Sequence, residues 1–289
     1  MSAPFAFAGR TCLITGAASG IGAALALELG RRRSVLVLVD RDAEGLARAA
    51  AAARELGAAD VTTYEIDLSD GGDRLDLAAE VAARHGGVDL LVNNAGVTLM
   101  GEFEQNALPD FEWLLEINLM AVIRLTKAFL PQLLARPGSH VVNVSSLFGL
   151  IAPAGQVAYV TSKFAVRGFT DALRHELEPR GVGVTVVHPG GIRTNIAANA
   201  RVSGGDPDGR QVAQARRFAE RALTMPAEEA AKQIVAAVHD RKPRLVIGGV
   251  AKGADLLARL TPTRYWRISQ RLAAVKKLQS DDDRPRRSS

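Results

Sequence analysis

Residues 15–22 read Thr15-Gly16-Ala17-Ala18-Ser19-Gly20-Ile21-Gly22 and join an apolar run, residues 11–15, to a segment of helical periodicity. Glycines let a backbone approach a pyrophosphate closely, and the free N–H groups at the start of a helix attract anions. Three residues separate the first two glycines, so the spacing differs from the usual dinucleotide fingerprint. The stretch predicts either a tight strand-to-helix turn or a phosphate-binding turn. In the second case the cofactor-binding residues are Gly16, Ser19, Gly20, Ile21 and Gly22.

The rest of the chain repeats this order of a β-branched run followed by a helical segment. Most of the runs are continuously apolar, as strands are when both faces of a parallel sheet are covered. The alternation predicts one α/β domain, residues 1–250, with a doubly wound parallel sheet. The expected strands are residues 11–15, 35–40, 61–67, 88–93, 140–145, 182–188 and 244–247. The expected helices are residues 20–33, 43–56, 73–85, 109–135, 157–180 and 227–240.

Two regions depart from the alternation. Residues 195–225 form a long insertion with a break at Gly204, Gly205 and Pro207. Because long connections often cover active sites, we expect a substrate lid there. Residues 251–279 predict a C-terminal helical extension, and residues 280–289 a disordered tail.

Composition narrows the class of protein. The chain has 289 residues, 47% of them hydrophobic, and a single cysteine, Cys12, so it has no intrachain disulfide, which suits a reducing compartment. Residues 1–9 lack the features of a signal peptide, and no apolar run approaches the roughly 20 residues that span a bilayer. The formal charge of +5 is not gathered into one patch. We therefore expect a cytoplasmic protein without a metal site or a nucleic-acid partner.

Acidic residues close the second and third expected strands. Asp40 stands where a carboxylate accepts hydrogen bonds from both ribose hydroxyls of NAD and repels the 2′-phosphate of NADP. Arg41 is able to pair with that phosphate, and Asp40 is also a candidate helix cap. Asp67-Leu68 is expected at the adenine, or Asp67 serves as a cap or turn residue. NAD is the expected cofactor, with NADP possible.

A third polar motif, Asn93-Asn94-Ala95-Gly96, ends the fourth expected strand. Ligands of open α/β sheets bind beyond the carboxyl ends of the strands. Asn94, Ala95 and Gly96 are therefore candidates to line the cofactor crevice. The same residue types also form ordinary turns.

Ser146 and the run Tyr159-Val160-Thr161-Ser162-Lys163 carry the most chemical content. Tyr159 and Lys163 share a helix face because they are four residues apart. A close ammonium and the positive nicotinamide of an oxidised cofactor lower a tyrosine pKa from about 10, so that the phenolate acts as a base. A Tyr/Lys pair alone predicts surface packing. This pair follows a strand, two serines and a flexible turn over residues 149–155, which favours catalysis.

Together these motifs resemble those of the classical short-chain dehydrogenases/reductases over residues 9–247. The matching motifs are Thr-Gly-x-x-x-Gly-Ile-Gly, Asn-Asn-Ala-Gly, Ser146 with Tyr159-x-x-x-Lys163, and Pro189-Gly190 after the sixth expected strand. The resemblance implies a Rossmann fold with seven strands, an oxidoreductase that acts on CH–OH groups, and hydride transfer to the B face of the nicotinamide.

The resemblance also assigns roles to single residues. Asn118 is similar to the family's helix asparagine and is expected to hold a water of the proton relay. Ser146 fits the serine-to-tyrosine spacing better than Ser145 and is expected to orient the substrate oxygen. The implied catalytic set is Asn118, Ser146, Tyr159 and Lys163, of which Tyr159 and Lys163 also meet the cofactor. The implied cofactor loop comprises Pro189, Gly190, Ile192 and Thr194.

The chain departs from the family pattern in two places. Its cofactor loop contains Gly191 and Arg193, and Arg193 is either a solvated side chain or a group that steers an acidic substrate. A long tail replaces the family's glycine-rich ending, which bears on the usual tetramer packing. His188 is expected in the core or behind the site, not as a catalyst.

These residues predict hydride transfer between a secondary alcohol, or its ketone, and NAD(H), with Tyr159 as the acid–base. We expect a medium-sized lipophilic substrate because the predicted pocket wall is apolar. That wall comprises Leu99, Met100, Leu147, Phe148, Pro153, Val157 and Ile196. Two alternatives are an NADPH-dependent ketone or 3-oxoacyl reductase and a non-catalytic nucleotide-sensing protein.

The C-terminal extension carries apolar residues at helical spacing, and Pro262 splits them into two groups. The apolar residues are Leu257, Leu260, Ile268, Leu272 and Val275. The basic residues around them are Arg259, Arg264, Arg267, Arg271, Lys276 and Lys277. Such helices pack on their own domain, on a second subunit or on an anionic membrane. Because two short helices bind a membrane weakly, we expect a homo-oligomer, a dimer or a tetramer.

Overall fold

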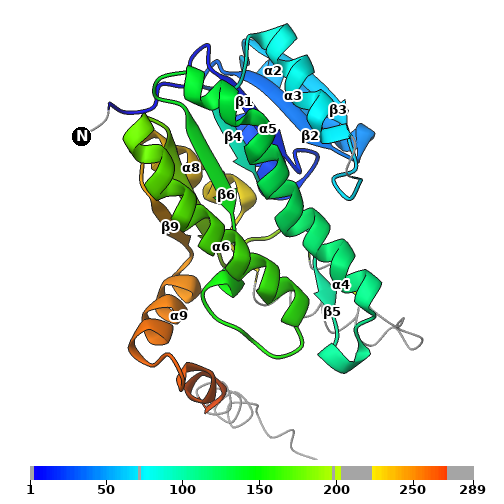
Figure 1. Cartoon of the computed structure of the whole chain (residues 1–289), viewed down its shortest axis with the longest axis vertical. Helices are drawn as coiled ribbons and strands as arrows, with labels where there is room; N and C mark the ends of the chain where they lie inside the picture. Colours follow the sequence, from blue (N-terminus) through cyan, green and yellow to red (C-terminus); the bar gives the residue numbers. More distant parts are fainter. Residues whose placement is uncertain (1–2, 71–72, 197–198, 203–222, 272–289) are drawn as a thin grey trace, which may run out of the picture.

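The computed structural model describes residues 3–70, 73–196, 199–202 and 223–271. Its main sheet consists of β1 (Thr11–Thr15), β2 (Val35–Asp40), β3 (Asp60–Glu65), β4 (Leu90–Asn93), β6 (His140–Val144), β7 (Gly183–Pro189) and β9 (Arg244–Ile247). These seven strands are parallel and lie in the order β3-β2-β1-β4-β6-β7-β9 (Figure 1). From β1 the chain adds strands on one side of the sheet up to β3, and from β4 onward it adds them on the other side. At such a switch point a crevice opens beyond the carboxyl ends of the strands.

Helices cover both faces of the sheet. One face carries α1 (Gly20–Gly30), α2 (Ala43–Glu55) and α8 (Ala227–His239), and the other carries α3 (Asp73–His85), α5 (Ala121–Ala135) and α6 (Val157–Leu177). In Figure 1, α5 and α6 cross in front of the sheet and α8 lies behind it. The predicted doubly wound Rossmann fold with seven strands is confirmed.

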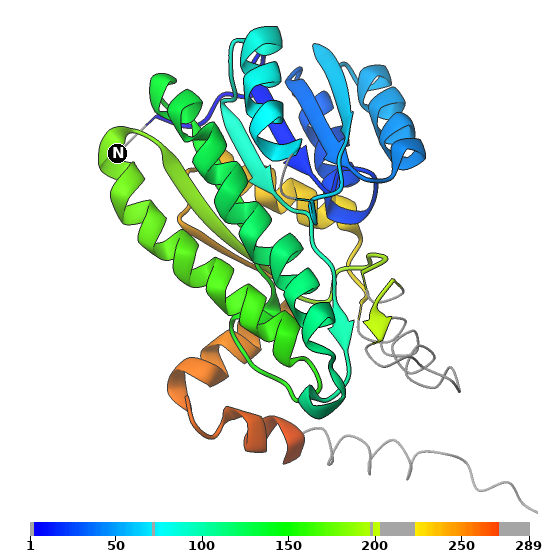
Figure 2. The ribbon, with the colours of Figure 1, turned by 45° about the vertical axis from the view of Figure 1, so that its right-hand side comes forward.

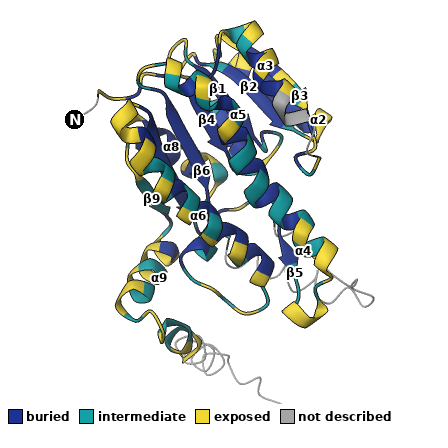
Figure 3. Ribbon diagram, in the orientation of Figure 1, coloured by how far each residue is buried: buried dark blue, intermediate teal, exposed yellow. Residues whose placement is uncertain are grey.

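The continuous apolar runs are explained by this double covering. Cys12 and Ile14 of β1 pack into the core under α1 and α8, whereas Leu13 packs into the core under α3 and α5. All five residues of β1 are buried, and Figure 3 shows the same for the neighbouring strands. A strand with one solvated face would alternate apolar and polar residues, which β1 does not do.

The predicted helix over residues 109–135 is interrupted. The structure contains α4 (Leu108–Leu115), a π-helical turn (Glu116–Met120) and then α5. Within the turn the N–H of Ala121 bonds to the carbonyl of Glu116, five residues back. Apolar periodicity does not reveal such a turn, because it inserts one residue without ending the helix.

Two predicted helices are also too long. The one over residues 20–33 ends at Gly30, and the chain turns at Arg33 with φ +58°. The one over residues 157–180 ends at Leu177 and is followed by a 3-10 turn, Glu178–Arg180. Arg33 is not a glycine, so the sequence gives no sign that the backbone enters the left-handed region there.

A second, two-stranded sheet was not predicted. It pairs β5 (Leu99–Met100) with β8 (Arg201–Val202) in parallel, and so joins the chain after β4 to the insertion at residues 195–225. Strands of two residues are too short to show a period. Residues 197–198 and 203–222 of the predicted lid lie outside the described residues.

The C-terminal extension begins with α9 (Gly249–Leu260), and residues 265–271 are again helical after the break at Pro262. Figure 2 shows this segment beneath one end of the domain, in orange to red. Val250, Leu256 and Leu260 of α9 are exposed. Residues 272–289, which include the predicted disordered tail, lie outside the described residues. Within the described parts of the chain, no helix has the length and apolar character needed to cross a bilayer.

Candidate active site

The glycine-rich turn after β1 has a backbone that only glycine accepts readily. Gly16 and Gly20 have φ values of +67° and +54°. A Cβ at Gly16 would lie 2.8 Å from the Cα of Ala95, and a Cβ at Gly22 would overlap the carbonyl oxygen of Gly16. The turn is therefore pressed against the end of β4 and the start of its own helix.

The first turn of α1 leaves its N–H groups available. Ser19 is the N-cap residue, and its side chain makes no capping hydrogen bond among the described residues. The helix α2 differs, because the carboxylate of its N-cap Asp42 accepts from the N–H of Gly45 at 3.0 Å. The unused N–H groups of α1 point out of the turn and suit an anion such as a pyrophosphate.

Asn94 braces this turn from the neighbouring strand. Its side-chain amide donates to the carbonyls of Thr15, at 2.9 Å, and Gly16, at 3.2 Å. The hydroxyl of Thr15 accepts from the N–H groups of Asn94 and Ala95, both at 3.1 Å. Asn94 thus shapes the crevice, and Thr15 is a supporting residue that the sequence analysis did not single out. The sequence did point to Thr15, because it is the first residue of the glycine motif.

Asp40, at the end of β2, faces the same turn. One carboxylate oxygen accepts from the N–H of Ala18 at 3.0 Å, and the other accepts from the N–H of Asp42 at 3.2 Å. Arg41 lies on the surface, 4.0 Å from the carboxylate of Asp67, and Leu68 is buried. Asp40 therefore sits beside the glycine turn with oxygen lone pairs to spare. Arg41 is directed to Asp67.

Ser146, Tyr159 and Lys163 come together at the carboxyl end of β6. Ser146 precedes a 3-10 turn, Leu147–Gly149, and its side chain hydrogen-bonds Tyr159 on the first turn of α6. The ammonium of Lys163 lies 5.6 Å from the centre of the Tyr159 ring and donates to the carbonyl of Val144 at 3.2 Å. Ser145 is not part of this cluster, because its hydroxyl donates to the carbonyl of Lys163 at 2.8 Å.

Burial dominates the acid–base properties of the pair. It raises the pKa of Tyr159, against the opposing effect of the hydrogen bond from Ser146, and it lowers the pKa of Lys163 to about 8. The lowering of the tyrosine pKa that is expected with an oxidised cofactor bound stays a prediction, because without the cofactor burial has the larger effect. The phenolate is a buried anion, and an ammonium that burial also disfavours does not compensate for its lost hydration.

Asn118 lies in the π-helical turn and is fully buried. Its side-chain oxygen accepts from the N–H of Val97 at 2.8 Å, while its amide donates to the carbonyl of Val97 at 2.9 Å and to the hydroxyl of Ser162 at 3.1 Å. These bonds occupy the side-chain amide, and the water of the proton relay expected at Asn118 stays a prediction. Turns of the π type are frequent at functional sites.

Gly96 links Asn118 to the catalytic cluster. A Cβ at Gly96 would lie 3.2 Å from the ammonium nitrogen of Lys163 and 3.3 Å from the side-chain oxygen of Asn118. The backbone of Gly96 therefore passes between the two side chains. The sequence-predicted catalytic residues all meet at this point of the crevice.

The predicted pocket wall is only partly present. The ring of Phe148 lies edge-on to Tyr159, with ring centres 6.1 Å apart, and Ile196 packs against the same small core. Met100, Leu147 and Pro153 are half-buried. Leu99 is fully buried in the same small core as Tyr159, and Val157, the first residue of α6, is 39% exposed. Phe111 and Trp113 of α4, which the sequence analysis missed, pack against this core.

The loop after β7 closes the cofactor side. The N–H of Gly190 donates to the carbonyl of Ile247 at 3.0 Å. A Cβ added at Gly20 would lie 3.2 Å from the methyl carbon of Thr194. Ile192 is buried in the core and pairs with Met225, so only its backbone is open to a ligand. Pro189 is the last residue of β7.

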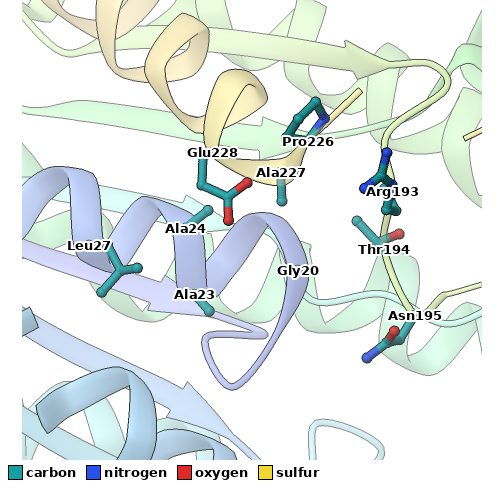
Figure 4. A pocket seen from close by; sticks show the side chains of 10 residues that line it. All are labelled: Gly20, Ala23, Ala24, Leu27, Arg193, Thr194, Asn195, Pro226, Ala227 and Glu228. Carbon is teal, nitrogen blue, oxygen red and sulfur yellow. The ribbon is translucent and has the colours of Figure 1, made fainter. Parts of the chain in front are cut away.

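A cavity of about 360 Å³ lies where this loop meets the starts of α1 and α8 (Figure 4). Its lining residues are Gly20, Ala23, Ala24, Leu27, Arg193, Thr194, Asn195, Pro226, Ala227 and Glu228. Arg193 is exposed there, and its guanidinium donates to the carbonyl of Thr224 at 3.2 Å. Two helix N-termini and one arginine give the cavity a positive edge next to the glycine turn. Over the described ranges, no group of three His, Cys, Asp or Glu side chains is placed to hold a metal.

His188 stands behind the catalytic serine. It is fully buried at the end of β7, and its Nδ1 lies 3.1 Å from the carbonyl oxygen of Ser146. Because a carbonyl only accepts, Nδ1 carries the hydrogen of this bond. Burial lowers the pKa of His188 to about 4, so the ring is neutral at pH 7. This position agrees with the expectation of a supporting role.

The chain is similar to known proteins in sequence and in fold. The family model for short chain dehydrogenases matches residues 10–203. SadH of Mycobacterium tuberculosis, which is named as an oxidoreductase, is 43% identical over 264 residues, 91% of this chain and 94% of SadH. Estradiol 17-beta-dehydrogenase 11 of Homo sapiens is 32% identical over 271 residues, 93% of this chain and 84% of that protein. A short chain dehydrogenase/reductase of Burkholderia phymatum, solved in complex with NAD, superposes with a TM-score of 0.81 at 31% identity, covering 88% of this chain and 94% of its own.

Proposed function

The chain belongs to the short chain dehydrogenase family, and from that premise we propose that it transfers a hydride between a secondary alcohol, or its ketone, and NAD(H). The observation that carries the proposal is the cluster of Ser146, Tyr159 and Lys163 at the carboxyl end of β6. One strand, β4, separates it from β1 and the glycine turn, and the point where the strand order reverses lies between them. Acid–base and hydride chemistry are thereby brought to one crevice.

The residues of the chain handle the proton. Tyr159 removes the hydroxyl proton of the alcohol as the carbinol C–H bond breaks, or donates a proton to the ketone oxygen in the reverse direction. Ser146 hydrogen-bonds the same oxygen. Bound NAD+ supplies the acceptor for the hydride that leaves the carbinol carbon. The raised pKa of Tyr159 keeps the phenol protonated at neutral pH in the chain alone, which suits proton donation to a ketone.

Lys163 connects Tyr159 to solvent. Its ammonium would hold the nicotinamide ribose, and its position beside Gly96 and Asn118 gives the proton a way out through the π-helical turn. A water bound at that turn would continue the relay. In this proposal Asn118 acts by shaping the turn, since its amide is bound to Val97 and Ser162.

We assign NAD, not NADP, as the preferred cofactor. The N–H groups at the start of α1 would hold the pyrophosphate, and the carboxylate of Asp40 would accept from the ribose hydroxyls and repel a 2′-phosphate. Arg41 is exposed and lies 4.0 Å from the carboxylate of Asp67, which competes with a 2′-phosphate for it. A measured preference for NADPH would favour the ketone or 3-oxoacyl reductase alternative.

The substrate class follows from the side chains around Tyr159. Phe148, Ile196, Met100 and Leu147 are apolar and half-buried. Such a wall binds a lipophilic alcohol or ketone of medium size better than a charged one. A relative named for estradiol 17-beta-dehydrogenase acts, by its name, on a molecule of that character.

The decisive variant is Tyr159→Phe, which deletes the hydroxyl and keeps the ring. Turnover on a panel of lipophilic secondary alcohols and ketones should fall by at least about 100-fold, the contribution of a general acid–base. NADH affinity, measured by fluorescence titration, should stay within about twofold, because the phosphates bind at the glycine turn. Near-normal turnover by the variant on any substrate of the wild type would refute the assignment.

The enzyme is further proposed to be a cytoplasmic homo-oligomer, a dimer or a tetramer. The exposed apolar side chains of Val250, Leu256 and Leu260 on α9 support a contact with a second subunit. Replacing Val250, Leu256 and Leu260 by serine should lower the mass measured by light scattering. Unchanged mass together with salt-sensitive binding of the full chain to anionic vesicles would favour a peripheral membrane enzyme.

A further inference from the structure

The C-terminal arm, residues 249–271, reaches the far side of the catalytic cluster at three points. The turn that it meets, residues 145–156, connects Ser146 at the end of β6 to Tyr159 on α6. The arm is distant from this turn in sequence but lies directly against it. Each contact uses a different kind of interaction.

The first contact is steric. Ala251, on the first turn of α9, is fully buried. A Cβ at Gly190 would lie 2.7 Å from the Cβ of Ala251 and 3.4 Å from that of Leu147. Only a glycine at position 190 lets α9 seat this close to the cofactor loop and to the residue after Ser146.

The second contact is ionic. Asp255 of α9 forms a two-pronged pair with Arg244 of β9, with nitrogen–oxygen distances of 2.7 and 3.0 Å. The register of β7 and β9 puts Arg244 on the same sheet face as His188, and the charge of Arg244 helps to lower the pKa of His188. His188 in turn donates to the carbonyl of Ser146. The ion pair of the arm therefore lies behind the backbone of the catalytic serine.

The third contact is a hydrogen bond between residues 113 positions apart. The N–H of Ala152 donates to the hydroxyl oxygen of Tyr265 at 2.9 Å. Among the described residues, it is the one backbone N–H between Ala152 and Gly155 that has a partner. Ala154 and Gly155 form a tight turn, with φ +74° at Gly155. Tyr265 holds the start of this turn, at Ala152, from the side of the arm.

We propose that the C-terminal arm is a positioning element of the active site and that Tyr265 fixes the turn between Ser146 and Tyr159 in its substrate-binding shape. This inference rests on the proposed function for its kinetic consequence. Tyr265 does not touch the reacting atoms. It acts through Ala152 and thereby on Pro153, which lies on the substrate side of the turn in the wall predicted from sequence. Substrate affinity should therefore depend on Tyr265 more than the chemical step does.

The test compares Tyr265→Phe with Tyr64→Phe. Each substitution removes one hydroxyl, and Tyr64 lies on β3, away from the catalytic cluster. For Tyr265→Phe we expect KM for the alcohol to rise about threefold to tenfold, the range for losing one hydrogen bond, with a smaller change in kcat. The NADH dissociation constant should stay within about twofold. Tyr64→Phe should leave all three values near those of the wild type.

A second readout works without any substrate. Amide hydrogen exchange in peptides that cover residues 146–156 should become faster in Tyr265→Phe and stay unchanged in Tyr64→Phe. Unchanged exchange in Tyr265→Phe would overturn the inference whatever the enzyme acts on, and faster exchange with a wild-type KM would overturn the positioning role. If the proposed function is wrong, the wild-type enzyme will turn over none of the alcohols or ketones in the panel. The hydrogen-exchange comparison will then still show whether the arm holds the turn.

Discussion

The cofactor side and the substrate side of the crevice are built in different ways. On the cofactor side, Thr15, Asp40 and Asn94 end three adjacent strands and hold the glycine turn with hydrogen bonds of 2.9 to 3.2 Å. On the substrate side, the wall comes from the turn after β6, from α4, from residues near the β5–β8 pair, and from the arm behind them. Strand ends position a general binding site, whereas specificity depends on segments that only tertiary contacts bring together.

The largest effect is expected from breaking the cofactor side. In Gly22→Ala the new Cβ overlaps the carbonyl oxygen of Gly16, which is backbone and has no rotamer to change. The glycine turn must shift away from its position under the phosphates. NADH binding, measured by fluorescence or calorimetry, should weaken by at least about 100-fold, equal to about 3 kcal/mol.

Gly168→Ala is the matched control for Gly22→Ala. Gly168 also lies in a helix, α6, but a Cβ there meets no atom within 4 Å. The change should leave NADH affinity intact and stabilise the fold by about 1 kcal/mol, the helix propensity difference between alanine and glycine. Equal NADH affinities of the two variants would contradict the close packing of the glycine turn.

The difference between the two sides explains how much the sequence predicts. The cofactor residues follow buried strands directly, so their spacing and the strand–helix alternation placed Gly16, Asp40 and Asn94 at one sheet edge. The seven strands of the sheet were predicted for the same reason, since most are continuous apolar runs that alternate with helical segments. The short pair β5–β8 was not, because two residues show no period.

The substrate side was harder to predict because burial there depends on contacts distant in sequence. Leu99 and Val157 were both expected in the wall, and the sequence did not show that the first is fully buried and the second 39% exposed. The contact of Tyr265 with Ala152 has no sequence pattern at all, since a hydroxyl bonding to a backbone N–H requires no particular spacing. The π turn around Asn118 is likewise invisible to apolar periodicity.

The next effect concerns the buried ammonium. Burial lowers the pKa of Lys163 from 10.5 to about 8, which corresponds to a cost of about 3 kcal/mol for keeping it charged. Below pH 8 both folded and unfolded chains hold the proton, and the full cost is present. Between pH 8 and 10.5 the unfolded chain binds more protons than the folded chain, so the free energy of unfolding rises with pH. Above pH 10.5 Lys163 is neutral in both states, and its burial no longer costs stability.

Lys163→Met should therefore stabilise the chain without cofactor by up to about 3 kcal/mol at pH 7, and by much less at pH 10, while turnover is lost. Urea denaturation at the two pH values measures both numbers. Lys127→Met, at an exposed position of α5, should show neither the gain nor its pH dependence. A Lys163→Met chain that is less stable than the wild type at pH 7 would contradict a costly buried ammonium.

A smaller effect sharpens the cofactor assignment. Asp40→Asn keeps an oxygen that accepts from the N–H of Ala18 but removes the charge that opposes a 2′-phosphate. The ratio of NADPH to NADH affinity should rise by about tenfold, or about 1.4 kcal/mol. Asp42→Asn, which also removes one carboxylate and keeps an oxygen for the cap of α2, should leave the ratio nearly unchanged. A wild-type preference for NADPH would overturn the role of Asp40.

The most direct measurement follows the hydride itself. A lipophilic secondary alcohol with deuterium on its carbinol carbon is incubated with NAD+ and the wild-type enzyme, and the NADH formed is analysed by proton NMR and mass spectrometry. The proposed chemistry predicts one deuterium per NADH, at C4 and on a single face, with one ketone formed for each NADH. NADH that carries no deuterium, or no NADH from any alcohol of the panel, would contradict hydride transfer from a carbinol carbon at this site.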